Sequence, residues 1–106
     1  MNRIPIALIL LAVSIGGGAD GASLAQRGHA LVARMCAQCH AIGKNDSSPH
    51  PAAPAFRRLD RQLDFDRFAD RLRRGLMTGH QDMPMFRFSR DDANAVAAYL
   101  RSIQGP

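Results

Sequence analysis

The stretch Cys36-Ala37-Gln38-Cys39-His40 holds two cysteines separated by two residues and followed directly by a histidine. Two thiols at this spacing lie close enough on one turn of backbone to form thioethers with both vinyl groups of a single haem. The histidine is then carried beneath the iron, where its imidazole can bind as the proximal ligand. The motif therefore predicts one covalently attached haem, with Cys36 and Cys39 as attachment residues and His40 as a metal ligand.

Three other interpretations of the same residues find less support. A thioredoxin-like redox pair lies at a strand-to-helix junction, and no alternating β-branched run precedes Cys36. A disulfide between Cys36 and Cys39 would close a very short loop and leave His40 without a role. A structural zinc site needs four ligands. Outside the motif, the remaining histidines have no paired spacing, and we expect them to be exposed residues rather than ligands: His29, His50 and His80.

The N-terminus has the pattern of a secretory signal. A single Arg3 precedes twelve mostly aliphatic residues from Ile4 to Ile15, and glycines and other small residues follow. We predict a signal peptide over residues 1–25, cleaved after Ala25, with Gly21 as the second choice. The apolar stretch is shorter than the roughly 20 residues of a membrane-spanning helix, so an uncleaved anchor is the alternative. Export would bring the thiols into the oxidising periplasm, where covalent haem attachment takes place.

The remaining domain, residues 26–106, is too short for a large core of its own. Chains of this size usually need a cross-link, a metal or a cofactor for stability. A haem is a large apolar plate that the chain could surround on both faces. The sequence predicts three helices and no convincing strand, which is an all-α fold. Their expected ranges are residues 24–35, 64–75 and 89–103, with Asp64 and Ser89 as N-caps.

Two irregular segments separate the expected helices and offer further site residues. Residues 41–63 form a long proline-containing loop, and loops of this length are unusual unless they are functional. Residues 77–88 contain Met83-Pro84-Met85. Pro84 fixes an extended turn that can hold the Met83 thioether away from the chain, so Met83 is favoured over Met77 and Met85 as a thioether that could reach a cofactor. We expect the haem pocket to be apolar and built from Phe56, Phe65, Phe68, Phe86 and Leu100.

The whole of residues 26–106 resembles the small monohaem class I cytochromes c of bacterial periplasms. Gly28, eight residues before Cys36, is similar to the helix-crossing glycine of that family, and Tyr99-Leu100 looks like its aromatic partner. The resemblance implies three main helices with long loops around one haem c, His40 as the proximal ligand and Met83 as the distal one, with Met85 as the alternative. It also implies that the Pro54 carbonyl accepts the Nδ1–H of His40.

Two protein ligands on the iron leave no open site, so the resemblance implies a one-electron carrier and not an enzyme. The alternatives are an electron-accepting subunit of a periplasmic dehydrogenase, and a haem-based ligand sensor or weak peroxidase. The net charge is +5, and it is unchanged by removal of residues 1–25, which hold one Arg and one Asp. We expect a monomer with no membrane span after signal cleavage and no nucleic-acid partner. The expected partners are redox proteins with acidic docking surfaces, a dehydrogenase, oxidase or reductase, which would meet a basic rim around the haem. That rim would be formed by Arg57, Arg58, Arg61, Arg67, Arg71, Arg73, Arg74, Arg87 and Arg90.

Overall fold

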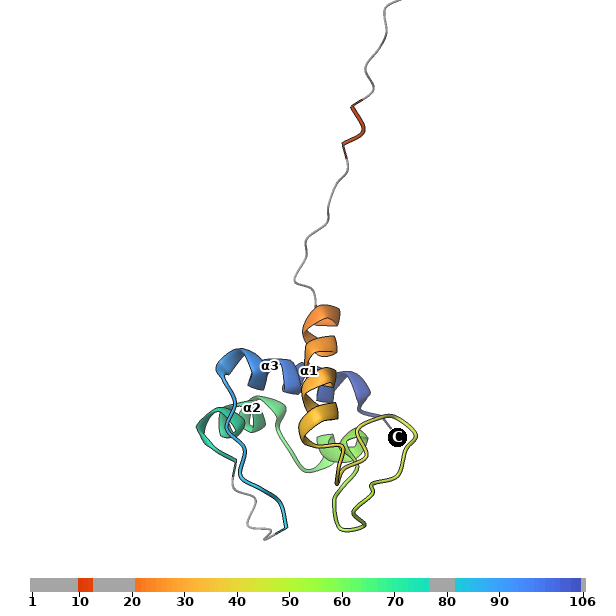
Figure 1. The fold of residues 1–106 in the computed structure, drawn as a ribbon, viewed down its shortest axis with the longest axis vertical. Helices are drawn as coiled ribbons and strands as arrows, with labels where there is room; N and C mark the ends of the chain where they lie inside the picture. Colours follow the sequence, from red (N-terminus) through yellow and green to blue (C-terminus); the bar gives the residue numbers. More distant parts are fainter. Residues whose placement is uncertain (1–9, 13–20, 77–81, 106) are drawn as a thin grey trace, which may run out of the picture.

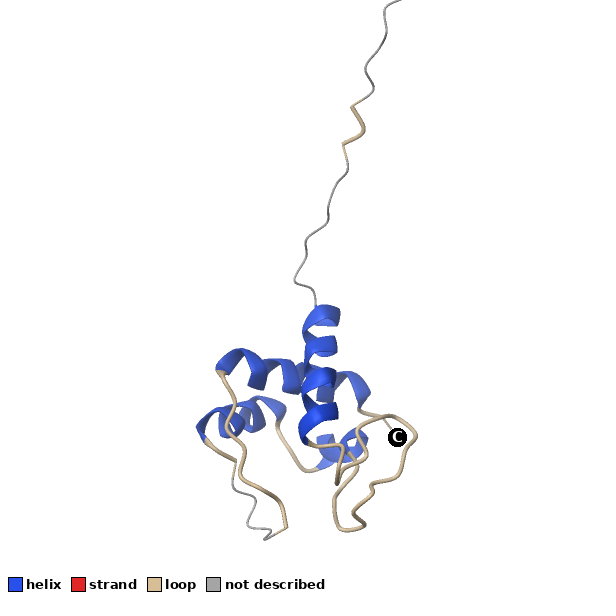
Figure 2. Ribbon diagram, in the orientation of Figure 1, coloured by secondary structure: helices blue, strands red, loops and turns tan. Residues whose placement is uncertain are grey.

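The computed structural model describes residues 10–12, 21–76 and 82–105. Its elements are α1 (Gly21–Met35), the 3-10 helix η1 (Phe56–Arg61), α2 (Phe65–Arg74) and α3 (Arg90–Ile103), arranged as in Figure 1. Among the described residues no strand is formed, and the only extended pairing is a single bridge between Leu76 and Phe86. Figure 2 accordingly shows helices joined by loops. The predicted all-α class is confirmed.

The starts of α2 and α3 follow from local sequence. The Asp64 side chain accepts hydrogen bonds from the backbone N–H groups of Asp66 and Arg67, at 2.9 and 3.1 Å. The Ser89 hydroxyl accepts from the N–H of Asp92 at 3.1 Å. Each cap satisfies amide donors that the helix itself cannot pair. Both predicted N-caps are therefore confirmed.

The centre of the fold is the crossing of α1 over α3, and Figure 1 shows α1 passing in front of α3 at a steep angle. Gly28 makes the close approach possible, because a Cβ atom added there would lie 1.9 Å from the carbonyl oxygen of Ala95. The Arg27 guanidinium also pairs with the Asp92 carboxylate at 2.6 Å and ties the two helices together. Helix α2 and η1 pack on α3. The crossing fixes the position of the residues that follow α1, which are those of the Cys-x-x-Cys-His motif.

Helix α1 begins at Gly21, three residues before the predicted start. The preferred signal cleavage site after Ala25 thus lies inside this helix, and the second choice lies at its first residue. Most of the predicted signal segment falls outside the described residues. Among residues 10–12, 21–76 and 82–105, no helix is long and apolar enough to cross a membrane.

The helix η1 lies in the segment expected to be an irregular loop. Its first residue is held by the rest of the fold: the Phe56 N–H donates to the Ala41 carbonyl at 3.0 Å, and the Phe56 side chain is buried. The turn is stabilised by partners distant in sequence and has no side-chain N-cap, since the Ala55 methyl group cannot accept a hydrogen bond. Such a turn leaves little periodic pattern to detect.

Candidate functional site

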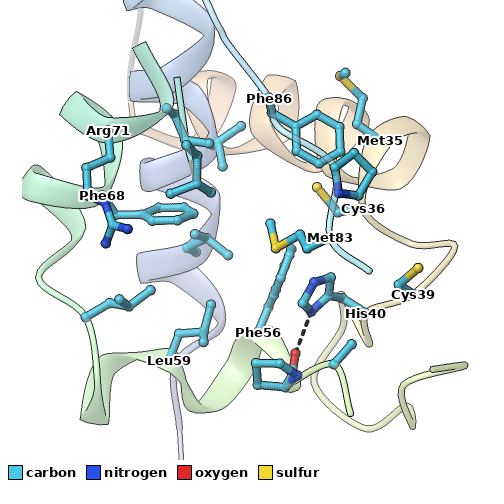
Figure 3. A pocket seen from close by; sticks show the side chains of 18 of the residues that line it. Met35, Cys36, Cys39, His40, Phe56, Leu59, Phe68, Arg71, Met83 and Phe86 are labelled. Carbon is cyan, nitrogen blue, oxygen red and sulfur yellow. Dashed lines mark hydrogen bonds between the residues drawn. The ribbon is translucent and has the colours of Figure 1, made fainter. Parts of the chain in front are cut away.

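A cavity of about 410 Å³ opens between the end of α1, η1, α2, α3 and the segment before α3. This volume lies within the range of roughly 300–1,000 Å³ that is typical of cofactor and small-molecule sites. Figure 3 shows Cys36, Cys39 and His40 along one wall, and Leu59 and Phe68 along the facing wall. The walls are mostly apolar, and they also include Leu72, Leu76, Phe86, Phe88, Val96 and Leu100. The Cys-x-x-Cys-His motif and apolar side chains of the helices therefore line one common cavity.

The Cys-x-x-Cys-His motif continues directly from α1 as hydrogen-bonded turns. The Cys36 N–H donates to the Val32 carbonyl at 2.8 Å, and the His40 N–H donates to the Cys36 carbonyl at 2.9 Å. Both cysteines are half-buried free thiols. Burial raises the pKa of Cys36 to about 11. Reactive redox cysteines need a lowered pKa, so this direction is opposite to that of a thioredoxin-like thiol.

The His40 imidazole is held from two sides. Its Nδ1 lies 2.8 Å from the Pro54 carbonyl oxygen, the contact drawn as a dashed line in Figure 3. Because a carbonyl only accepts hydrogen bonds, Nδ1 carries a proton, and Nε2 is the ring nitrogen left for a metal. The Phe56 ring packs against the imidazole with centroids 4.6 Å apart. The geometry therefore presents an oriented imidazole with Nε2 available to a metal.

Backbone hydrogen bonds fasten the segment that carries Met83 to α2 and to Leu76, just beyond the end of that helix. The Leu76 N–H donates to the Phe86 carbonyl, and the Phe88 N–H donates to the Leu72 carbonyl, both at 2.8 Å. The second bond satisfies a carbonyl in the last turn of α2, where no helical partner remains. These bonds hold the chain after Met83 against a rigid element.

The methionines of this region differ in burial. Met83 lines the cavity and packs against the hydrophobic core, and Figure 3 shows its side chain beside His40. Met85 is 63% exposed and does not line the cavity. A Cβ atom added at Gly75 would lie 3.8 Å from the Met85 sulfur, so this side chain covers the end of α2. Met77 lies outside the described residues.

Two expectations about side chains near the cavity are wrong. His50 is half-buried and lines the cavity, whereas we expected an exposed residue. Its Nδ1 accepts the Ala52 N–H at 3.2 Å, and its Nε2 lies 3.6 Å from the Asp82 carboxylate across the cavity mouth. Phe65 packs against the core but does not line the cavity. The position of Phe65 depends on the register of α2 against its neighbours, which the hydrophobic pattern of α2 alone does not give.

The other histidines bear on the zinc alternative. His29 is exposed, with its ring 4.9 Å from that of Tyr99, and His80 lies outside the described residues. Within the described part of the chain, no three His, Cys or Asp side chains gather so that they could hold a metal ion. The four-ligand zinc interpretation therefore gains no support there.

The arginines do not form a continuous rim around the cavity. Of the nine that we expected there, Arg71 is the one that lines it, with an exposed side chain at its mouth. Arg73 pairs with Asp70 at 2.9 Å, and its hydrogen bond is the main reason that the pKa of the Asp70 carboxyl is lowered. Arg90 lines a separate groove between α2 and α3. The basic surface is therefore divided between the cavity mouth and other faces.

The residues of the cavity fit a covalently attached haem. They provide a free imidazole nitrogen, a thioether, two neighbouring thiols and apolar walls, which is the donor set and environment of a c-type haem. On an all-α fold, these features define the small class I c-type cytochromes. The chain belongs to the family described as cytochrome c oxidase, cbb3-type, subunit III, whose profile matches residues 23–100.

Comparison with known proteins agrees with this class. Cytochrome c-552 of Bradyrhizobium diazoefficiens is 31% identical over 98 residues, which cover 91% of this chain and 92% of that protein. No solved structure matches the chain. Membership of the family implies covalently bound haem c and an electron-transfer protein rather than an enzyme. The predicted function class and cofactor are thereby confirmed.

Proposed function

We propose that Cys36 and Cys39 attach the haem through thioethers and that His40 and Met83 are its proximal and distal iron ligands. Pro54 orients the His40 imidazole. The observation that carries this assignment is the hydrogen bond from His40 Nδ1 to the Pro54 carbonyl oxygen, which leaves Nε2 free beside a cavity that also holds the Met83 thioether. When bound, the haem supplies a one-electron couple between ferric and ferrous iron.

The chain's own residues would tune this couple and keep it reversible. His40 is fixed by the Pro54 carbonyl and the Phe56 ring, and the Met83 segment is fastened to α2, so neither side chain has to move between redox states. A soft thioether favours ferrous iron, and the apolar walls disfavour the extra positive charge of the ferric state. Both effects raise the reduction potential. With two protein ligands, the site suits electron transfer rather than substrate binding, which disfavours the sensor and peroxidase alternatives.

The two candidate methionines provide a direct test. Met83→Ala should abolish the long-wavelength sulfur-to-ferric-iron band and lower the reduction potential. Met85→Ala is the matched control, because its side chain is mostly exposed, and it should leave both nearly unchanged. The reverse outcome would move the distal ligand to Met85. Retention of the band in both variants would overturn methionine ligation at these positions.

The finer cellular role is also part of the proposal. The N-terminal segment directs export to the periplasm, with cleavage after Ala25 or after Gly21, and leaves residues 26–106 as the cytochrome domain. Its partners are redox proteins with acidic docking surfaces. The oxidase in the family's description supports a terminal oxidase among them. An electron-accepting subunit of a periplasmic dehydrogenase uses the same site, and co-purification at native abundance would distinguish such a subunit from a diffusing carrier.

A further inference from the structure

The Gln104 side chain joins three backbone groups just beyond the end of α3. Its Nε2 donates to the carbonyl oxygens of Phe56 and Leu100, at 2.7 and 2.8 Å. Its Oε1 accepts the N–H of Asp60 at 3.0 Å. A carboxamide carries two donors and an acceptor in one plane, so a single side chain can satisfy all three groups. Two of these groups belong to η1, which lies 44 and 48 residues earlier in the sequence.

Phe56, one of these two η1 residues, also contacts His40 and the residue that follows it. The Phe56 N–H donates to the Ala41 carbonyl at 3.0 Å, and its ring packs on the His40 imidazole with centroids 4.6 Å apart. Pro54, two residues before, accepts the hydrogen bond from His40. Phe56 is therefore held at its N–H by the residue after His40 and at its carbonyl by Gln104. A second bond, from the Gly105 N–H to the Arg57 carbonyl at 3.3 Å, joins the same two segments.

We propose that Gln104 is a positioning residue for the proximal imidazole, because it fixes Phe56, and through it Pro54, against α3. The inference rests on the proposed ligation by His40 and adds a determinant outside the haem motif. The hydrogen-bond partner of a metal-bound histidine sets its ring orientation and basicity. Displacement of η1 would loosen both the carbonyl that binds Nδ1–H and the ring that packs on the imidazole. Gln104 thus acts on His40 without touching it.

If Gln104 acted only as a cap at the end of α3, its replacement would change stability but not the His40 imidazole. The bond from Gln104 to Leu100 caps a helix carbonyl, so its loss could lower stability without any effect on His40. Ser102 offers a matched control, because its hydroxyl donates to the Tyr99 carbonyl at 2.6 Å in the same last turn and makes no hydrogen bond to η1. Ser102→Ala removes a side-chain bond from that helix end and leaves η1 untouched.

The test uses the haem-loaded protein with Gln104→Met, Gln104→Glu and Ser102→Ala. Methionine keeps the length of the side chain but cannot donate hydrogen bonds to the carbonyls of Phe56 and Leu100. Glutamate can still accept the N–H of Asp60, but it places a carboxylate oxygen where the glutamine Nε2 faced these two carbonyls. The readouts are solvent exchange of the His40 Nδ1 proton in ferrous protein and the hyperfine shifts of its ring in ferric protein, both by NMR. We expect exchange to accelerate by about fivefold in Gln104→Met, with shifted ring resonances, since one net hydrogen bond is worth about that factor. Ser102→Ala should match the wild type.

Two results would overturn the inference and leave the ligation by His40 standing. One is wild-type exchange and ring shifts in Gln104→Met, which remains informative if Gln104→Glu does not fold. The other is an equal change in Ser102→Ala, which would assign the effect to the helix end. Absence of any histidine ligand signal in the wild-type protein would overturn the ligation itself, and this inference with it.

Discussion

Replacement of Gly28 by alanine should destabilise the haem-loaded protein more than an ordinary helix substitution. The added Cβ would lie 1.9 Å from the Ala95 carbonyl oxygen, 2.5 Å from its carbon and 2.8 Å from the Tyr99 Cβ. Contacts below 3.0 Å essentially never occur for a real Cβ, so the helices must separate by about 1 Å or more. The nearest atoms belong to the backbone of a packed helix and cannot rotate away.

The size of the effect follows from two opposing contributions. Overpacking a tight contact costs about 1–3 kcal/mol, and a backbone clash lies at the upper end. Alanine recovers about 1 kcal/mol through its higher helix propensity. The free energy of unfolding should therefore fall by about 2 kcal/mol. For a domain of this size, that corresponds to a decrease in Tm of about 10 °C.

Urea unfolding followed by circular dichroism measures this difference, provided that the dependence of unfolding on denaturant is the same in both proteins. Gly105→Ala is the control, because an added Cβ there meets no atom within 4 Å, and the change in stability should stay within about 0.5 kcal/mol. A Gly28→Ala protein as stable as the wild type would refute the close crossing of α1 and α3.

Three further outcomes are expected. The haem-free protein should be largely unfolded, since so short a chain buries little without its cofactor; cooperative thermal melting of apo protein with full helicity, followed by circular dichroism, would contradict this. Electron transfer to the physiological partner should slow as salt is added, because salt screens the attraction between the two proteins. Stopped-flow kinetics should show a larger decrease in the second-order rate constant for Arg71→Glu, at the cavity mouth, than for Arg90→Glu, where the arginine lines another groove. A rate constant that is flat or rises with ionic strength would contradict electrostatic steering. Burial and, to a lesser extent, the Asp46 charge raise the pKa of Tyr99, so its contribution to stability is complete below the ordinary value of 10.0 and is lost as the pH rises through the folded-state pKa. Tyr99→Phe should lack this alkaline loss in urea titrations at several pH values, and an unchanged alkaline slope would assign it to other groups.

The parts of the fold encoded by adjacent residues could be predicted from the sequence. Asp64 and Ser89 cap helices through amides two or three residues away, so their role is visible in a short window. The role of Gly28 was predictable because it lies eight residues before Cys36, like the helix-crossing glycine of the family, and the Ala95 carbonyl provides the close contact. These features depend on the backbone nearby and on one exceptional residue.

The parts decided by distant contacts could not be predicted. The helix η1 depends on Ala41 and Gln104, which no local pattern connects to Phe56. His50 lines the cavity because of the path of its loop, and Phe65 packs elsewhere on the core because of the register of α2. The nine arginines lie in nearby segments of the sequence, which suggested one basic rim around the haem, but the fold places them on different faces. Side chains around a cavity are selected by tertiary packing, which a single sequence records only weakly.

Covalent attachment of one haem at the Cys-x-x-Cys-His motif can be tested with one measurement, the pyridine haemochrome spectrum of the exported protein after extraction with acidified acetone. Attachment through Cys36 and Cys39 predicts one haem per chain that stays with the polypeptide and has the spectrum of a porphyrin with both vinyl groups saturated. Cys36→Ser should give the spectrum of a single thioether or no haem. Haem that is extracted from the wild-type protein, or a wild-type protein without haem, would contradict the proposed site.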